Sequence, residues 1–406
     1  MTEATPATRP PVNDRLLIVV LAAITAAGPV AMNIYLPALP AVQAHFGTTV
    51  AEMNTTVSTA LVAFAIGILL YGPISDRFGR RPIILWGQVV FAAGNLLCLL
   101  APTLEALLAG RVVQALGTSA GLVVARAVLG DLYGREKMAR MLAYLTMVMV
   151  VGPTTTPLIG GLITENLGWQ SVFGFLLVGN AVIIFVTWRY LPETRPAAAR
   201  AARTADLVRA WLHMLRQPAF AGFTVQSGVI YATFLTFISI APYVMIRLGH
   251  SATEYGLWYL FVASGYFIGN WTVARHATRI GLHRLISLGV TLQLACAAVG
   301  AGLVLAGFWS PMAIFIPMGV LGFGQGMAMP NITASAVALA PRTPGAASSM
   351  LGFAQQMIGA LAVQGMAVFA TDTPVPIYLF TVAVALVAWL SLFVLPRADA
   401  LPRREN

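Results

Sequence analysis

Twelve long apolar runs constrain this chain more than any other feature. A helix that crosses a membrane needs about 20 mostly apolar residues, because the hydrocarbon core is about 30 Å thick and lipid satisfies no backbone hydrogen bonds. The runs lie at residues 15–38, 52–74, 82–100, 106–130, 138–164, 170–191, 219–246, 254–275, 283–308, 311–336, 345–371 and 375–395. With 58% hydrophobic and 9% charged residues, the composition is too apolar for a soluble globular protein. The sequence predicts an all-α membrane protein with twelve transmembrane helices.

Positive charge is distributed unevenly among the connections between these runs. If the N-terminus lies in the cytoplasm, the outward connections contain a single arginine, Arg247. The inward connections contain Arg77, Arg80, Arg81, Arg135, Lys137, Arg140, Arg195, Arg200, Arg203, Arg209, Arg216, Arg279, Arg284 and Arg342. This asymmetry is the positive-inside pattern, which predicts that both termini are cytoplasmic. It accounts for the net charge of +10 without a nucleic-acid partner.

The longest polar stretch, residues 191–218, divides the runs into six and six. We expect a cytoplasmic tail at 1–14, a six-helix bundle at 15–191, a cytoplasmic linker at 192–218, a second six-helix bundle at 219–395 and a cytoplasmic tail at 396–406. The first run lacks a small-residue cleavage site and precedes eleven more, so we expect it to be retained. Arg77-Phe78-Gly79 and Arg279-Ile280-Gly281 lie at matching places in the two halves. Such a repeat favours a transporter whose two pseudo-symmetric bundles rock around a central cavity.

The connector "GPISDRFGRRP", residues 72–82, resembles the signature of the major facilitator superfamily. Its candidate gating residues are Gly72, Asp76, Arg77, Gly79, Arg80 and Arg81. The glycines permit a tight turn, Asp76 can accept hydrogen bonds, and the arginines can latch the halves in one state. A basic anchoring loop would explain the arginines but not the spacing of all six residues.

The fourth run contains an arginine within the stretch "LLAGRVVQALGTSAG", residues 107–121. It resembles the fourth-helix motif of the same superfamily, with Arg111, Gln114 and Gly117 in place. Arginine inside a span costs ~2.5 to 3.5 kcal/mol on insertion scales, so it normally faces a partner or a wet cavity. The alternative is a side chain that snorkels to the outer interface.

The fifth run contains "GPTTTPLIGG", residues 152–161, which resembles the drug-antiporter motif of paired prolines and glycines. Pro153 and Pro157 remove backbone donors and bend the helix, whereas Gly160 and Gly161 allow another helix to approach closely. The resemblance implies export rather than uptake. Thr156 stands where the motif has glycine, and a simple kinked packing helix is the alternative.

Four further stretches narrow the resemblance to one group. They are "MNIYLPALP" in the first run, "ARAVLGDLYGRE" at 125–136, "LGWQSVF" before Asn180, and "GAASSMLGFAQQ" at 345–356. Together they resemble bacterial drug-resistance transporters of the Bcr/CflA group, which export bicyclomycin, chloramphenicol and florfenicol. The resemblance implies drug:proton antiport across the bacterial inner membrane, with one chain, a monomer, forming the pathway.

Asn33 departs from that group, whose first-helix motif has an aspartate at this position. An aspartate in a partly dry cavity can exchange a proton for cargo, but a carboxamide cannot titrate. Asn33 and Arg111 lie at similar predicted depths, so an aspartate at position 33 would form a charge switch with Arg111. Three explanations stay open: an engineered variant fixed in a protonated-like state, a natural chain with different or absent coupling, or a ligand-binding amide.

No other carboxylate is predicted to replace the missing aspartate at mid-membrane. All fourteen acidic residues fall at span ends, in connectors or in tails, and Asp131 and Glu165 are the nearest to the cavity. Pro37 and Pro40 cannot continue a regular helix, so we expect them to end the first span at the outer face.

Polar or aromatic residues at mid-depth are the candidates for cargo contact. They are Asn33, Tyr35, Gln114, Tyr231, Phe234, Tyr259, Gln355 and Gln356. A cavity with amides and aromatic rings but no fixed carboxylate suits neutral amphiphiles, such as phenicol-like or bicyclic compounds, better than cations.

Other functions are less well supported. A metabolite exporter for a sugar, amino acid or nucleoside would share this fold, whereas a receptor or assembly factor would not need duplicated gating loops. We expect no enzyme, cofactor or metal site, because the five histidines, His45, His213, His250, His276 and His283, lie in connectors or at span ends.

Overall fold

The computed structural model describes residues 14–133, 135–195, 204–341, 343–369 and 373–395, and all regular structure within these ranges is helical. The helices are α1 (Asp14–Tyr35), the short turn η1 (Leu36–Ala38), α2 (Leu39–Phe46), α3 (Val50–Phe78), α4 (Arg80–Leu99), α5 (Leu104–Leu132), α6 (Arg135–Leu167), α7 (Gln170–Tyr190), α8 (Thr204–Leu215), α9 (Pro218–Arg247), α10 (Ala252–Ile280), α11 (Leu282–Leu305), α12 (Pro311–Ala338), α13 (Pro344–Val368) and α14 (Val375–Val394). The tails predicted at 1–14 and 396–406 lie almost wholly outside the described residues.

Each of the twelve predicted spans corresponds to one long helix. Ten segments of the described chain are long and apolar enough to cross a membrane. The other two, α6 with 33 residues and α10 with 29, are long enough but less apolar. These two helices pack against each other, so part of each surface faces protein rather than lipid. The predicted all-α fold of a multi-pass membrane protein is confirmed.

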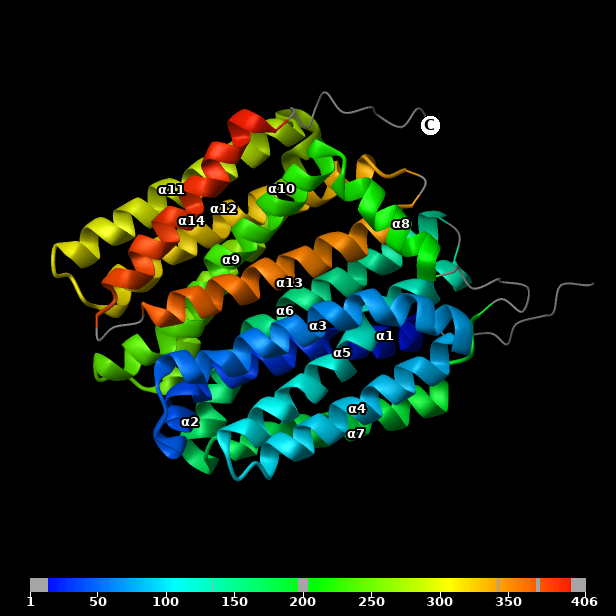
Figure 1. The fold of residues 1–406 in the computed structure, drawn as a ribbon, viewed down its shortest axis with the longest axis horizontal. Helices are drawn as coiled ribbons and strands as arrows, with labels where there is room; N and C mark the ends of the chain where they lie inside the picture. The colour runs from blue at the N-terminus through cyan, green and yellow to red at the C-terminus, as the bar shows by residue number, and fades with distance from the viewer. Residues whose placement is uncertain (1–13, 134, 196–203, 342, 370–372, 396–406) are drawn as a thin grey trace, which may run out of the picture.

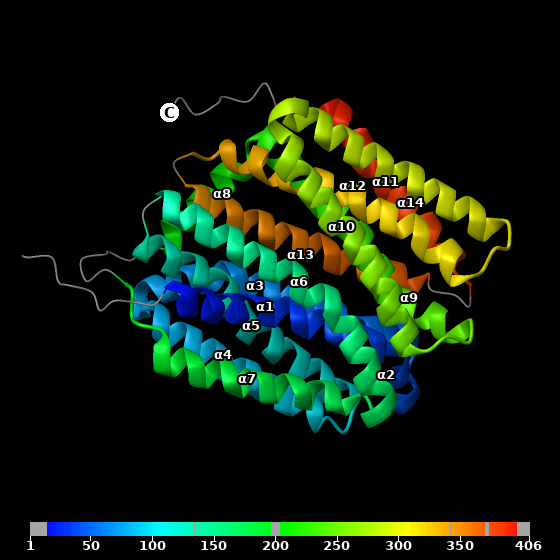
Figure 2. The same ribbon diagram turned by 180° about the vertical axis from the view of Figure 1, so that it is seen from behind.

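The helices pack as two groups. The first group comprises α1 and α3–α7, and the second comprises α9–α14. The groups meet where α6 packs against α10 and α3 packs against α13, as Figures 1 and 2 show from opposite sides. The pocket described below lies between them.

Matching caps at α3 and α10 show the predicted repeat in three dimensions. Thr49 and Glu52 form a capping box at the start of α3, and Ser251 and Glu254 form one at the start of α10. Both helices end at a glycine with positive φ, Gly79 at 100° and Gly281 at 90°, which leads directly into the next helix. Glycine suits this backbone conformation because it has no Cβ.

The regular helix α1 ends at Tyr35, two residues before Pro37, as predicted, but the chain does not leave the helical segment there. Pro37 lies in the short turn η1, and the chain continues through Pro40 into α2. Proline is tolerated in the first turn of a helix, where its missing N–H would lack an intrahelical partner. The helical segment ends at Gly47, which has a φ of 64°.

The linker between the two groups contains a helix that was not predicted. The indole Nε1 of Trp211 on α8 donates a 3.2 Å hydrogen bond to the carbonyl of Ala346 at the start of α13.

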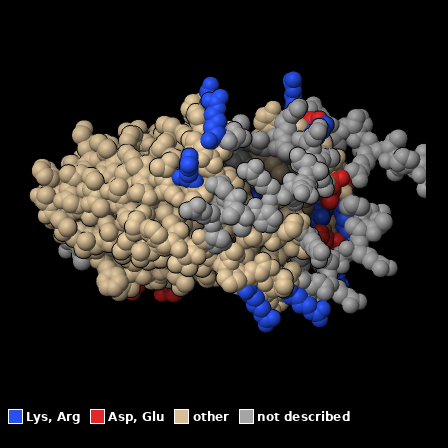
Figure 3. All heavy atoms as spheres, turned by 90° about the horizontal axis from the view of Figure 1, so that it is seen from above, with Lys and Arg blue, Asp and Glu red and all other residues tan. Residues whose placement is uncertain are grey.

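We call the end of the molecule near α8 the α8 end and the opposite end, where α2 lies, the α2 end (Figure 1). In Figure 3, lysines and arginines gather over the half that contains α8.

Candidate functional site

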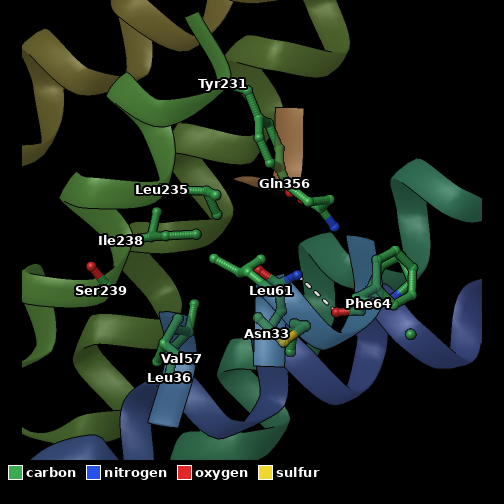
Figure 4. Close-up of a pocket in the computed structure, with 13 residues that line it drawn as sticks. Asn33, Leu36, Val57, Leu61, Phe64, Tyr231, Leu235, Ile238, Ser239 and Gln356 are labelled. Carbon is green, nitrogen blue, oxygen red and sulfur yellow. Dashed lines mark hydrogen bonds between the residues drawn. The ribbon is translucent and has the colours of Figure 1, made fainter. Parts of the chain in front are cut away.

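A pocket lies between the two helix groups, and Figure 4 shows its walls. It has about 560 Å³ of empty space, part of it open to solvent. The lining residues are Gly28, Pro29, Met32, Asn33, Leu36, Val57, Leu61, Phe64, Tyr231, Leu235, Ile238, Ser239 and Gln356. They come from α1, η1 and α3 on one side and from α9 and α13 on the other. No residue in this lining carries a charge.

Asn33 connects the two groups beside the pocket. Its Nδ2 donates to the carbonyl of Pro29, one turn earlier on α1, at 2.8 Å. Its Oδ1 accepts a 2.7 Å hydrogen bond from the hydroxyl of Tyr259 on α10. Both polar atoms of the amide are therefore engaged, and one bond crosses the interface between the groups.

Arg111 does not pair with Asn33, contrary to the expected switch. The guanidinium is 0% exposed, lies over the ring of Tyr35 at 4.5 Å and donates to the side-chain oxygen of Gln114. Its Nη2 lies 3.2 Å from the sulfur of Met32. Residues 32 and 33 of a helix point about 100° apart, so Arg111 contacts one face of α1 while Asn33 presents another face to α10.

Gln114 and Tyr35 belong to the interior of the first group rather than to the pocket. Gln114 is 2% exposed, and its Nε2 donates to Oδ1 of Asn95 on α4 at 2.7 Å. Tyr35 is 0% exposed, and its hydroxyl lies 3.2 Å from that of Thr56. The prediction that these two side chains line the cargo pocket is wrong, because helix-to-helix contacts within the group surround them.

The other predicted cargo residues divide between the pocket and its surroundings. Tyr231 and Gln356 line the pocket. Tyr259 adjoins it through Asn33, and the ring of Phe234 lies 6.2 Å from that of Tyr259. Gln355 is half-buried and does not contribute to the lining.

The prediction missed the apolar lining, because leucine and valine in a membrane helix carry no compositional signal for a binding site. Helical spacing was the available clue. Tyr231, Leu235, Ile238 and Ser239 follow one another at intervals that share a helix face.

The predicted gating loop forms a polar network at the α8 end. Arg80 pairs with Asp76 at 2.6 Å and with Asp131 on α5 at 2.9 Å. Glu193 accepts hydrogen bonds from the backbone N–H groups of Arg80 and Arg81 at 2.9 and 3.2 Å. These bonds join α3, α4, α5 and the residues after α7, and none of them reaches the second group as the latch prediction expects.

Glu193 was not predicted as part of this network. Burial acts to raise the pKa of its carboxyl, but the backbone N–H groups of Arg195, Arg80, Arg81 and Thr194 outweigh burial and hold the pKa below its usual range. The residue lies 113 positions from Arg80, and no local pattern relates the two.

The fifth-helix motif brings α6 close to two other helices. An added Cβ on Gly160 would lie 2.1 Å from the carbonyl oxygen of Ile34, and one on Gly161 would lie 2.5 Å from that of Ala252. On α10, a Cβ on Gly256 would lie 2.8 Å from the carbonyl of Pro157. The side chain of Pro153 lies outside the described residues. The motif therefore packs α6 against α1 and α10 at the α2 end.

Polar bonds accompany this packing at the α2 end. Glu165 on α6 accepts a 2.8 Å hydrogen bond from the backbone N–H of Thr253 on α10. Ser58 and Thr55 on α3 donate to the side-chain oxygen of Gln364 on α13 at 3.0 and 3.4 Å. Both interfaces between the groups are therefore bonded at the α2 end.

The residues that the structure describes contain no group of three histidine, cysteine, aspartate or glutamate side chains that could hold a metal ion.

Comparison with known proteins decides the family. The sequence profile of the Major Facilitator Superfamily matches residues 21–363. The chain belongs to the Major Facilitator Superfamily. It is therefore a membrane transporter of small molecules and not an enzyme.

Relatives within the superfamily agree with the predicted group. The chain is 31% identical to a chloramphenicol resistance protein of Pseudomonas aeruginosa over 76% of this chain and 72% of that protein. It is 28% identical to multidrug resistance protein D of Escherichia coli K12 over 85% and 86%. It is 25% identical to a bicyclomycin resistance protein homolog of Haemophilus influenzae over 92% and 94%. The predicted resemblance to the Bcr/CflA drug transporters is confirmed.

Solved structures of the superfamily share the fold. A D-xylose-proton symporter superposes with a TM-score of 0.74 at 15% identity over 95% of this chain and 98% of that one. A bacterial homolog of the lysosomal transporter Spinster, in an inward-facing conformation, superposes with a TM-score of 0.73 at 18% identity over 95% and 97%.

Proposed function

We propose that this chain is built as a secondary active exporter of small neutral amphiphilic drugs, such as phenicol-like or bicyclomycin-like compounds, that works by drug:proton antiport, and that Asn33 holds it in a drug-binding state that does not complete the proton step. The uncharged pocket between the two groups carries the proposal. Its lining is mostly apolar, with an amide at Asn33 and at Gln356, a hydroxyl at Ser239 and an aromatic ring at Tyr231. These few polar groups can orient a neutral cargo while the apolar wall binds its body. The names of the three relatives support drugs as the cargo.

Transport proceeds by alternating access in a single chain. The bonds of Glu165 to Thr253 and of Ser58 to Gln364 close the α2 end, so this state takes cargo from the α8 end. The excess of basic residues at the α8 end supports its placement in the cytoplasm, with both termini, at the bacterial inner membrane. Export then requires the α2-end bonds to break as the groups rock apart.

Asn33 places a side chain that cannot take up or release a proton where related transporters have an aspartate. A protonated carboxyl at this position could accept from Tyr259 and donate to the carbonyl of Pro29, as the amide does. The ionised carboxylate could only accept, so it would lose the bond to Pro29 and place a negative charge at the contact with the second group. The amide cannot change charge and holds the Tyr259 bond at every pH. We infer that Asn33 mimics a protonated aspartate and favours the state closed at the α2 end.

Filling the pocket tests the proposed cargo site. Leu61 lines the pocket, whereas Leu97 on α4 is exposed on the outer surface of the first group. The Leu61→Trp variant is expected to abolish equilibrium binding of chloramphenicol to the purified chain, and Leu97→Trp is expected to leave it within about twofold, since an added indole there meets lipid. Equal binding by both variants would show that cargo binds elsewhere.

A further inference from the structure

Arg126 is a charged residue within a membrane-spanning helix that the proposed function does not use. It lies on α5, six residues before the helix ends at Leu132, which is about 9 Å from the α8 end at the usual helical rise. The side chain is exposed, although its neighbours Ala125, Val128 and Leu129 are 0% exposed. Charged residues inside spans normally face a water-filled path or a partner and mark functional positions.

The contacts of α5 define the direction in which Arg126 points. Gly121 faces α1, because an added Cβ would lie 2.6 Å from the carbonyl of Ile24. Ser119 faces α3, because its Oγ would lie 1.9 Å from a Cβ on Gly67. At 100° per residue, Arg126 points about 20° away from the direction of Ser119, on the side of α3 that is turned toward α1.

The same face of α5 leads to the pocket wall. Leu122, one turn from Arg126 toward the α2 end, packs against the cluster that contains Phe64. Phe64 lines the pocket together with Met32 and Leu61. Arg126 is therefore placed at the approach to the pocket from the α8 end, which is the open side in the proposed cycle.

No counter-charge neutralises this arginine within the described part of the chain. Asp76 and Asp131 pair with Arg80, and Asp14 pairs with Lys137 at 2.5 Å. The structure shows no hydrogen bond or ion pair for Arg126 among the described residues. The approach to the pocket thus presents a fixed positive charge, while the pocket itself carries none.

We propose that Arg126 selects cargo by charge. The exporter accepts neutral and anionic amphiphiles, the acidic group of an anionic cargo pairs with the Arg126 guanidinium while its apolar body enters the pocket, and cations are rejected. Arginine suits this role because its planar donors bind a carboxylate in two places and it stays protonated at all physiological pH values. The inference rests on the proposed function and extends it to the charge of the cargo.

Three probes of one scaffold test the selection by charge. They are chloramphenicol, which is neutral, its hemisuccinate ester, which is anionic at pH 7, and its deacylated amine, which is cationic. Equilibrium binding of each is measured on the purified full-length chain, on Arg126→Gln and Arg126→Lys, and on Arg209→Gln as a control on the exposed surface of α8. Melting temperatures of all variants report folding.

The expected result separates the three probes. Wild type binds the hemisuccinate at least as tightly as chloramphenicol and the amine at least about tenfold more weakly. Arg126→Gln weakens the affinity for the hemisuccinate by about tenfold or more, which is the effect of one lost charge-assisted hydrogen bond. The same variant changes the affinity for chloramphenicol by no more than about twofold. Arg126→Lys keeps most of the preference for the hemisuccinate over the amine, and Arg209→Gln leaves the affinity for all three probes unchanged.

Other results overturn the inference. If Arg126→Gln weakened the binding of all three probes equally, the residue would have a structural role and would not select cargo by charge. If that variant does not fold, wild type alone decides, because equal affinity for the amine and the hemisuccinate contradicts selection by charge. If wild type binds none of the probes, the proposed function itself fails and the inference falls with it.

Discussion

The hydroxyl of Tyr259 on α10 donates a 2.7 Å hydrogen bond to the side-chain oxygen of Asn33 on α1, and this bond joins the two helix groups beside the pocket. The two residues are 226 positions apart in the chain. The amide of Asn33 also donates to its own helix at Pro29, so its orientation is held from both sides. The side chain at position 33 therefore contacts both helix groups, and its hydrogen bond to Tyr259 forms only when the two groups lie together.

Removal of the Tyr259 hydroxyl is expected to weaken the closed state. The Tyr259→Phe variant leaves Oδ1 of Asn33 without its partner, which costs about 1 kcal/mol only while the groups are together. Spin labels at the α2 end should therefore show a larger open population by pulsed distance measurements. Tyr255→Phe is the matched control, since the Tyr255 hydroxyl bonds to Ile238 within the second group. An identical distance distribution for Tyr259→Phe and wild type would contradict this role.

Replacement of Gly160 or Gly161 on α6 by any residue with a side chain is expected to destabilise the protein. Gly160→Ala and Gly161→Ala each place a Cβ against a backbone carbonyl that cannot move aside, and we expect a cost of about 1 to 3 kcal/mol. Gly161→Ala should in addition favour opening at the α2 end, because the obstructed carbonyl belongs to the second group. Gly179→Ala on α7, where a Cβ meets nothing within 4 Å, is the control. Melting temperatures equal to that of Gly179→Ala would refute the close packing.

Arg111 is expected to act on the stability of the first group rather than on cargo affinity. Arg111→Lys loses the planar stack on Tyr35 and the bond to Gln114, and a buried ammonium cannot replace them. We expect a loss of about 1.5 to 3 kcal/mol in stability, as for a lost hydrogen bond of a charged group. The variant should keep the chloramphenicol affinity of wild type wherever it remains folded. A selective loss of binding with an unchanged melting temperature would place Arg111 at the cargo after all.

Arg111 and Asn33 show how much the depth of a residue in the membrane predicts about its contacts. An arginine and an amide in apolar runs attract notice, and their heights follow from the helical rise. The direction of each side chain depends on how the helix is rotated, which its neighbours determine. For that reason the pairing of Asn33 with Tyr259, and of Arg111 with Tyr35, was not predicted. Glu193 was missed for a related reason, because its backbone partners carry no side-chain signal.

Glu193 should make stability depend on pH in a defined direction. Its pKa is held below the unfolded value by backbone N–H groups, so its contribution is present above the unfolded pKa of about 4.3 and is lost as the pH falls through the folded value. Glu193→Gln should lower the melting temperature at pH 7.5, and the difference from wild type should shrink below pH 4. A difference that grows on acidification would contradict the assignment.

The central claim is that position 33 controls the proton step of drug export. The decisive measurement compares this chain with its Asn33→Asp variant in liposomes and follows uptake of chloramphenicol driven by a pH gradient, together with equilibrium binding at several pH values. The account predicts that Asn33→Asp concentrates the drug with an affinity that depends on pH, whereas the chain with Asn33 binds the drug but does not concentrate it. Equal accumulation by both chains would contradict the account and transfer the proton step to another carboxylate, with Asp131 and Glu165 the first to test.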